Sequence, residues 1–422
     1  MKTNYNNKIP NDFFNNVLKI STSTIISALV VAIALPIITK MFSASMLGKY
    51  QLLISIITIF GVISCFKYEM AIVLPKKDNI ASNVLILCLL ALSSFCLILL
   101  LIFYFTNGVL LKALNAEILI DTFWLIPIGV FFFGLFEIIK YSLLRKKLFN
   151  HFSRARVYQV LSTQLLMIVF GLINPSFISL FLAFISGHFI STVAFLKKSL
   201  MKIKPTKNIQ IFKFAKKFKK FPFFNTPMVF ANTLSNELPV FFLATYFPSE
   251  TLGYFLLANR LIVIPMNLIG TAINKVYFQK ASEIFNRNEK NLFELYTDTT
   301  KKLILLGIPP LFVFYFLSDV IVDLVFGDKW VVTAQMMKII AVTAFFKFIT
   351  SPIGTSFTII NKQDIAFYLT FLSLVLRFFI MMNFHYSISS LFWAFTISSA
   401  IYYIVYHIFV FRLLSEISKD NE

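Results

Sequence analysis

Long apolar runs alternate with short polar segments along the chain, and this pattern predicts its helices. A helix needs about 20 mostly apolar residues to cross a bilayer, and twelve runs of this kind occur. Their lengths, and the lack of the alternating pattern of a membrane barrel, favour α-helices. The predicted spans cover residues 17–40, 48–67, 81–105, 118–139, 157–175, 177–196, 222–246, 252–276, 301–323, 332–357, 364–384 and 387–411. The first run leads directly into the next ones, so we expect a membrane span there and not a removed signal.

One polar turn occurs twice in the chain. "MFSASMLGKY" (41–50) joins the first two spans, and "YFPSETLGYF" (246–255) joins the seventh and eighth. Each reads Phe, four mostly small or polar residues, and then Leu-Gly. Six spans in each half give both halves the same orientation, as in a parallel repeat about an axis along the membrane normal. We therefore expect an all-α integral membrane fold with two six-helix lobes around a central cleft, divided as lobe 1–196, basic cytoplasmic linker 197–221 and lobe 222–422.

Composition supports this membrane class, and charge gives the orientation. The chain is 58% hydrophobic and 14% charged, whereas soluble proteins are about 45–50% apolar and about 25% charged. With the N-terminus in the cytoplasm, 31 of the 39 Lys and Arg fall in cytoplasmic segments and 4 in outer segments. This bias follows the positive-inside rule and predicts that both termini are cytoplasmic. The net charge of +20 is then expected to face anionic lipid, and no nucleic-acid partner is expected.

The polar segments offer little for catalysis. They are too short for a catalytic domain, and the sequence has no Gly-rich phosphate loop, no metal-ligand spacing of Cys and His, and no nucleophile motif. Cys65, Cys88 and Cys96 lie in apolar runs and are expected to be small buried hydrophobes. We expect a protein that is not an enzyme and that has no metal and no cofactor. The second half of the linker places phenylalanines among lysines, which suits a helix in the membrane interface.

Three segments resemble a known family. They are "PIITKMFSASMLGKYQLLISI" (36–56), "ELPVFFLATYFPSETLGYFLLANRLIVIPMNLIGTAINKVYFQKASE" (237–283) and "DLVFGDKWVVTAQMMKIIAV" (323–342). They are similar to the two lobes of the polysaccharide biosynthesis proteins, which are O-antigen and capsule flippases of the Wzx type. These belong to the multidrug/oligosaccharidyl-lipid/polysaccharide exporter superfamily. The motifs are loose, but the resemblance covers nearly the whole chain.

The resemblance implies a function and partners. Such flippases move an oligosaccharide linked to undecaprenyl diphosphate from the inner to the outer leaflet of the bacterial cytoplasmic (inner) membrane by alternating access. Lipopolysaccharide, O-antigen or capsule synthesis would use the product, with a polysaccharide polymerase and a chain-length regulator as possible partners beside membrane lipid. No nucleotide motif occurs, so ATP is not expected. Coupling to a proton or sodium gradient, or downhill flux, remains open.

A diphosphate crosses hydrocarbon only at high cost unless it is paired or wetted, so ionisable residues inside spans are the candidates for the cleft. Arg260 falls where the family pattern has Arg, and the resemblance implies that it contacts diphosphate or sugar acid groups. Glu237 is the expected counter-charge of Arg260; alternatively, the two form a salt bridge that only locks the lobe. Lys347 and Arg377 are expected either to hold phosphates or to snorkel to an interface.

Two further charges and three prolines complete the candidates. Lys40 stands at the outer end of the first span. Glu69 is a cleft candidate too, although we expect it chiefly to form a surface pair with Lys67. Prolines inside spans remove a hydrogen bond and can kink the helix. We assign a gating role to Pro227, Pro239 and Pro265; static kinks that only shape packing are the alternative.

Rival functions remain. A cation-coupled multidrug or small-molecule antiporter of the same superfamily would need an acid inside the first lobe, and spans one, three, five and six contain none. A membrane-embedded polysaccharide-modifying enzyme would show a large outer loop or an intramembrane His with an acidic neighbour, and the sequence has neither. A scaffold that transports nothing is a third possibility.

Overall fold

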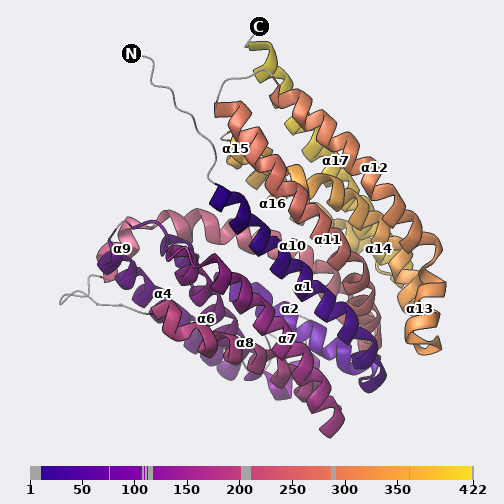
Figure 1. The fold of residues 1–422 in the computed structure, drawn as a ribbon. Coiled ribbons are helices and arrows are strands. Elements are labelled where there is room, and N and C mark those ends of the chain that lie inside the picture. Colours follow the sequence, from indigo (N-terminus) through magenta and orange to yellow (C-terminus); the bar gives the residue numbers. More distant parts are fainter. Residues whose placement is uncertain are drawn as a thin grey trace, which may run out of the picture.

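The computed structural model describes residues 11–75, 77–106, 109, 112, 117–200, 211–286, 291–360 and 362–420. Within these residues the chain is helical and contains no strand. Figure 1 shows two groups of helices, with the indigo-to-magenta half of the sequence on one side and the orange-to-yellow half on the other. The predicted all-α membrane class with two lobes is confirmed by this architecture and by the relatives reported below.

The first lobe contains the helices up to residue 200. They are α1 (Asn11–Met41), α2 (Ala44–Ile63), α3 (Tyr68–Ala71), α4 (Asp78–Phe105), the 3₁₀ turn η1 (Glu117–Thr122), α6 (Leu125–Arg145), α7 (Phe149–Ile173) and α8 (Phe177–Leu200). The break between α1 and α2 is set by Ser43, whose hydroxyl accepts a hydrogen bond from the Met46 amide at 3.3 Å and caps α2. Serine is a preferred residue at this position because it satisfies an amide that the helix leaves unpaired.

The second lobe contains several helices that are separated only by short breaks or 3₁₀ turns. Its elements are α10 (Thr226–Tyr246), α11 (Ser249–Asn286), α12 (Leu292–Phe316), α13 (Ser318–Phe326), the 3₁₀ turn η3 (Asp328–Trp330), α14 (Val331–Thr350), the 3₁₀ turn η4 (Ser351–Ile353), α15 (Ser356–Ile359), α16 (Gln363–Asn383) and α17 (Ile388–Asp420). The ninth predicted span is therefore split between α12 and α13. Gly327, at a φ of +80°, ends α13 in a conformation that glycine adopts readily.

Eleven helices among the described residues are long and apolar enough to cross a membrane. The remaining predicted span corresponds to α10, which has 21 residues but is less apolar than the others. Its sequence includes Asn232, Ser235, Asn236 and Glu237. Polar residues are tolerated inside a membrane span where the helix faces protein or a water-filled space. This suits α10, which packs between α2 and α16.

Part of the predicted linker forms its own small docking element. The short helix α9 (Ile211–Lys217) and the π turn η2 (Phe221–Asn225) lead into α10. Phe214 and Phe218 are buried, α9 packs on α4, and the Tyr68 hydroxyl donates to the Ala215 carbonyl at 3.3 Å. Phe212 is 91% exposed, in keeping with a helix at a membrane interface. Residues 201–210 of this linker lie outside the described residues.

The two copies of the repeated turn pack against each other. A Cβ placed on Gly48 would collide with the carbonyl oxygen of Ser249, and a Cβ on Gly253 would collide with the carbonyl oxygen of Ala44. The Ser45 and Ser249 hydroxyls lie 2.7 Å apart. The glycine at the Leu-Gly helix start of each copy therefore packs directly against the backbone of the other copy. We call this reciprocal packing the turn–turn contact, and the end of the bundle that contains it the turn end.

Candidate functional site in the contact between the lobes

The lobes meet mainly through α2 of the first lobe and α10 and α11 of the second, which lie together in the middle of Figure 1. A polar relay crosses this contact. The Gln51 amide donates to the Ser55 hydroxyl at 3.1 Å, and that hydroxyl donates to the Glu237 carboxylate at 2.6 Å. Because Ser55 is buried, the relay gives Glu237 a partner from the opposite lobe where water is excluded. Glu237 is thus bound across the two lobes.

Arg260 lies on α11 and also faces the first lobe. Its guanidinium is within electrostatic reach of the hydroxyl of Tyr50 on α2, and Tyr50 itself is buried. Arg260 and Glu237 form no ion pair in the part of the chain that the structure describes. The expectation that Glu237 is the counter-charge of Arg260 is therefore wrong: each of the two charges faces a polar side chain of α2, Ser55 for Glu237 and Tyr50 for Arg260.

Lys347 lies on α14, within electrostatic reach of both Glu237 and Arg377. Its side chain lines a small pocket between α14 and α11. The α11 side of that pocket includes Asn267, Gly270 and Thr271. Lys347 therefore connects the Glu237 relay to a polar stretch of α11. Lys347 is half-buried and faces helices of its own lobe, and its expected roles, holding phosphates or snorkelling to an interface, stay predictions.

Arg377 occupies a different environment, inside the second lobe. Only 4% of the residue is exposed. Its guanidinium donates to the Ser235 hydroxyl at 2.7 Å and lies 5.3 Å from the ring centre of Phe395 and 5.5 Å from that of Tyr402. A cation over two aromatic faces is stabilised by the ring quadrupoles. The structure thus holds Arg377 in a socket between α10, α16 and α17, and the snorkelling alternative is wrong.

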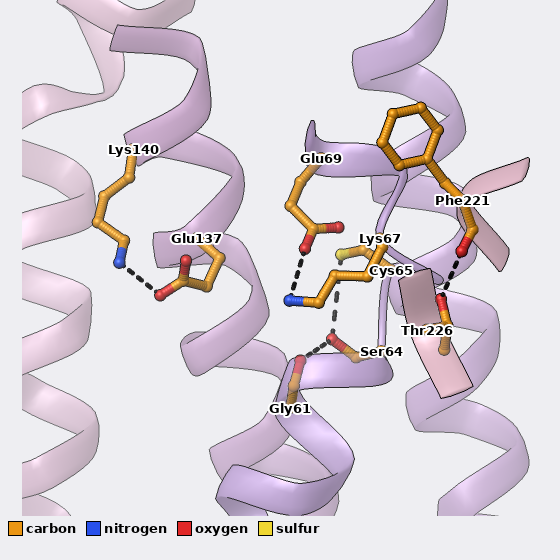
Figure 2. A network of polar contacts seen from close by, with 9 residues as sticks. All are labelled: Gly61, Ser64, Cys65, Lys67, Glu69, Glu137, Lys140, Phe221 and Thr226. Carbon is orange, nitrogen blue, oxygen red and sulfur yellow. Dashed lines mark hydrogen bonds and ion pairs between the residues drawn. The ribbon is translucent and has the colours of Figure 1, made fainter. Parts of the chain in front are cut away.

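Glu69 lies in the first lobe and does pair with Lys67 as predicted, but the expected surface location of this pair is wrong. The Glu69 carboxylate forms an ion pair with the Lys67 ammonium at 3.2 Å, and the side chains of Glu69 and Lys67 are 4% and 13% exposed, respectively. The pair is buried because the chain turns back after α2: Phe66 and Lys67 adopt left-handed φ values of 50° and 58°. Figure 2 shows this pair beside a helix that bears Glu137 and Lys140, themselves joined at 2.6 Å as an ordinary i,i+3 pair.

The remaining predicted site residues are one lysine and three prolines, which differ in burial and in their position along the helices. Lys40 is exposed in the last turn of α1, close to the turn end. Pro239 is buried inside α10 two residues after Glu237, and Pro265 lies inside α11 five residues after Arg260. Pro227 belongs to the first turn of α10, where a missing amide hydrogen costs that helix little, and the π turn η2 precedes it. Gating by these prolines stays a prediction.

Two polar stripes were missed by reading charges alone. Asn232 and Asn236 are exposed on α10, and Asn267 and Thr271 are exposed on α11. In each stripe the residues are four apart, which places them on one face of a helix. Exposed amides and hydroxyls on membrane-spanning helices mark a surface that meets water or a polar ligand. The i,i+4 spacing of these polar residues is the sequence signal that would have found them.

The fold and this polar contact define a class: a multi-pass membrane protein built like the transporters of the MOP superfamily. The chain is similar to a lipid II flippase MurJ in an inward closed conformation, with a TM-score of 0.73 and 17% identity over 95% of this chain and 90% of that one. An inward-facing multidrug resistance MATE family transporter of the MOP superfamily gives a TM-score of 0.63 and 14% identity, covering 96% and 95%. At these identities the likeness concerns the fold.

The family is shown by sequence. The model of the family described as "Polysaccharide biosynthesis protein" matches residues 37–335, well over half of the chain, and the chain belongs to this family. It is 25% identical over 154 residues to the teichuronic acid biosynthesis protein TuaB of Bacillus subtilis (strain 168), covering 36% of this chain and 32% of TuaB. It is 27% identical over 139 residues to the lipopolysaccharide biosynthesis protein WzxC of Escherichia coli (strain K12), covering 32% and 27%. The matched region thus spans 32% of TuaB and 27% of WzxC, which is less than a third of each relative.

Proposed function

We propose that this protein is a flippase that moves an undecaprenyl-diphosphate-linked oligosaccharide from the inner to the outer leaflet by alternating access. The observation behind the proposal is that Glu237 and Arg260 both face α2 of the first lobe, with Lys347 within electrostatic reach of Glu237. Glu237 and Arg260 thus place charge in the contact between two lobes of an otherwise apolar bundle, as a site for a charged headgroup requires. Cations offer a diphosphate charge-assisted hydrogen bonds, which are stronger than neutral ones. Membership in the polysaccharide biosynthesis family supports the sugar-lipid substrate.

Arg260 provides the test. In a strain deleted for this gene, a plasmid with the wild-type gene should restore surface polysaccharide, whereas Arg260→Ala should not, at equal amounts of membrane protein. The lipid-linked precursor should then accumulate facing the cytoplasm. Arg260→Lys keeps the charge but loses the planar fork, so we expect partial recovery.

The matched control is Lys338→Ala. Lys338 is another cation within a span, but it pairs with Asp319 at 2.6 Å on a part-exposed surface, so polysaccharide should be normal. Normal polysaccharide with Arg260→Ala would remove Arg260 from the mechanism. Normal polysaccharide in the deleted strain without any plasmid would overturn the proposed function itself.

Glu69 supports a second candidate, cation-coupled antiport. Spans one, three, five and six of the first lobe contain no acid, yet Glu69, just after the second span, is 3% exposed inside that lobe. Its Oε2 has no hydrogen-bond partner among the described residues, so the carboxylate could exchange a proton or hold a sodium ion. Under this candidate, Glu69→Gln should abolish toxic-cation resistance conferred by the overproduced protein. Unchanged resistance with and without the protein would exclude it.

A further inference from the structure

A groove in the second lobe lies apart from the contact between the lobes. It has a volume of about 590 Å³ and runs between α12 and α17 over α14. Its apolar lining includes Ile304, Phe346, Ile349, Ile404, Ile408 and Phe411. A volume of this size is typical of pockets for small ligands. Every described residue that lines the groove belongs to the second lobe, so the groove keeps its shape when the lobes move.

The polar atoms on the floor of the groove are already satisfied. Tyr296 and Thr350 bind the two ring nitrogens of His407, at 2.7 Å and 3.1 Å. The Thr300 hydroxyl donates to the Tyr296 carbonyl at 2.8 Å. Since these groups have partners within the protein, the floor does not require water or a hydrogen-bonding ligand. An apolar chain can therefore lie over it without leaving a buried polar group unpaired.

Two cationic side chains at the border of the groove make it positively charged. Lys301 of α12 and Arg412 of α17 are both exposed lining residues, and the described lining contains no acid. Neither cation forms an ion pair within the described part of the chain. Ile304, Ile404, Ile408 and Phe411 are each at least 40% exposed, so the apolar wall opens sideways and faces lipid. Basic pockets between membrane helices bind anionic lipid headgroups.

We propose that this groove binds an anionic glycerophospholipid of the surrounding leaflet. The phosphate lies between Lys301 and Arg412, and an acyl chain follows the apolar wall from Ile304 to Ile404. The charge complementarity favours an anionic headgroup over a zwitterionic one, because two cations face the ligand with no acid to bind a choline or amine. The inference does not depend on the proposed transport activity, since the groove does not open on the contact between the lobes.

Native mass spectrometry of the purified, delipidated full-length protein tests the proposal. Dioleoylphosphatidylglycerol should bind at least tenfold more tightly than dioleoylphosphatidylcholine, and the difference should shrink as salt screens the cations. The double variant Lys301→Gln/Arg412→Gln should lose this preference. Ile408→Trp, which fills the groove and keeps both cations, should weaken both lipids.

Lys302→Gln is the matched control, because Lys302 is the adjacent exposed lysine and does not line the groove. It should leave the preference unchanged. Equal binding of the two lipids by the wild-type protein would overturn the proposal. An effect of Lys302→Gln as large as that of the double variant Lys301→Gln/Arg412→Gln would do the same, because it would show diffuse attraction to a basic surface. Tighter binding of a polyprenyl phosphate than of phosphatidylglycerol would assign the groove to another lipid class and also contradict it.

Discussion

At the scale of residues, three charges of the second lobe, Glu237, Arg260 and Arg377, face neutral polar side chains. A charge inside a membrane span is costly and therefore indicates a structural or functional role. This argument identifies four residues in the sequence: Arg260, Glu237, Lys347 and Arg377. Their partners come from other helices: Tyr50 and Ser55 for the first two, Ser235 for Arg377. Such neutral partners have no sequence signal of their own. The pairing of Arg260 with Glu237 was therefore wrong although both residues lie at the contact.

Variants at Arg377 and at its partner Ser235 distinguish a role in stability from a role in transport. Ser235→Ala removes the hydroxyl that accepts from the guanidinium at 2.7 Å and leaves that buried nitrogen only the long 3.5 Å bond to the Ser235 carbonyl, so we expect a loss of about 1–3 kcal/mol in the free energy of unfolding. Thermal unfolding in detergent measures this loss. Thr299→Ala is the control, because the Thr299 hydroxyl bonds only within its own helix, to the Leu295 carbonyl, and it should change stability much less.

The charge of Arg377 itself is tested by Arg377→Met, which fills the same socket without the cation. If Arg377 only supports the lobe, a well-packed apolar side chain is often tolerated, and surface polysaccharide should persist. If its charge serves the headgroup through Lys347, surface polysaccharide should disappear while the protein remains folded. We expect the first result, because only 4% of Arg377 is exposed.

At the scale of elements, hydropathy predicted most helices because each must satisfy its own backbone and cover itself with apolar side chains. It located α1, α2 and α4 within a few residues. It missed the break at Leu317 between α12 and α13, since both sides of the break are apolar. It also gave no hint that Lys67 turns back into the protein, because a left-handed turn depends on the packing around it.

The turn–turn contact was predicted as a repeat but not as a contact, because packing between distant segments is invisible to a local pattern. Gly48→Ala tests its tightness. The new methyl group would collide with the backbone carbonyl of Ser249, which cannot move aside as a flexible side chain would. We expect a loss of about 1–3 kcal/mol in the free energy of unfolding, the usual cost of overpacking, measured by chemical unfolding in detergent.

Gly270→Ala is the control for stability. There the added Cβ would meet Pro352 at an ordinary 3.6 Å, and alanine is favoured over glycine inside a helix by up to about 1 kcal/mol. Its stability should equal or exceed that of the wild type. A Gly48→Ala protein as stable as Gly270→Ala would show that the two turns separate at no cost, and that their packing does not hold the lobes together.

At the scale of the whole molecule, the two ends of the contact between the lobes differ. The turn end is joined by reciprocal backbone packing and by the Ser45 and Ser249 hydroxyls. Away from it, Arg156 of the first lobe and Lys275 of the second lie within electrostatic reach of each other. Like charges repel, although Arg156 is also within electrostatic reach of Glu137 in its own lobe. The lobes are thus joined by close packing at the turn end, whereas two cations from opposite lobes approach each other at a second place.

If alternating access operates, the turn end must open in each cycle. Cysteines at Ser45 and Ser249 test this, because hydroxyls 2.7 Å apart bring their Cβ atoms near the spacing of about 3.5–4.5 Å that a disulfide needs. The oxidised Ser45→Cys/Ser249→Cys protein should stop exporting the lipid-linked sugar, and a reductant should restore export. Either single cysteine should export normally under oxidation, and the native Cys65, Cys88 and Cys96 are buried and unpaired. Full export with the cross-link complete, as measured by peptide mass spectrometry, would show that the substrate crosses without separation of the turns.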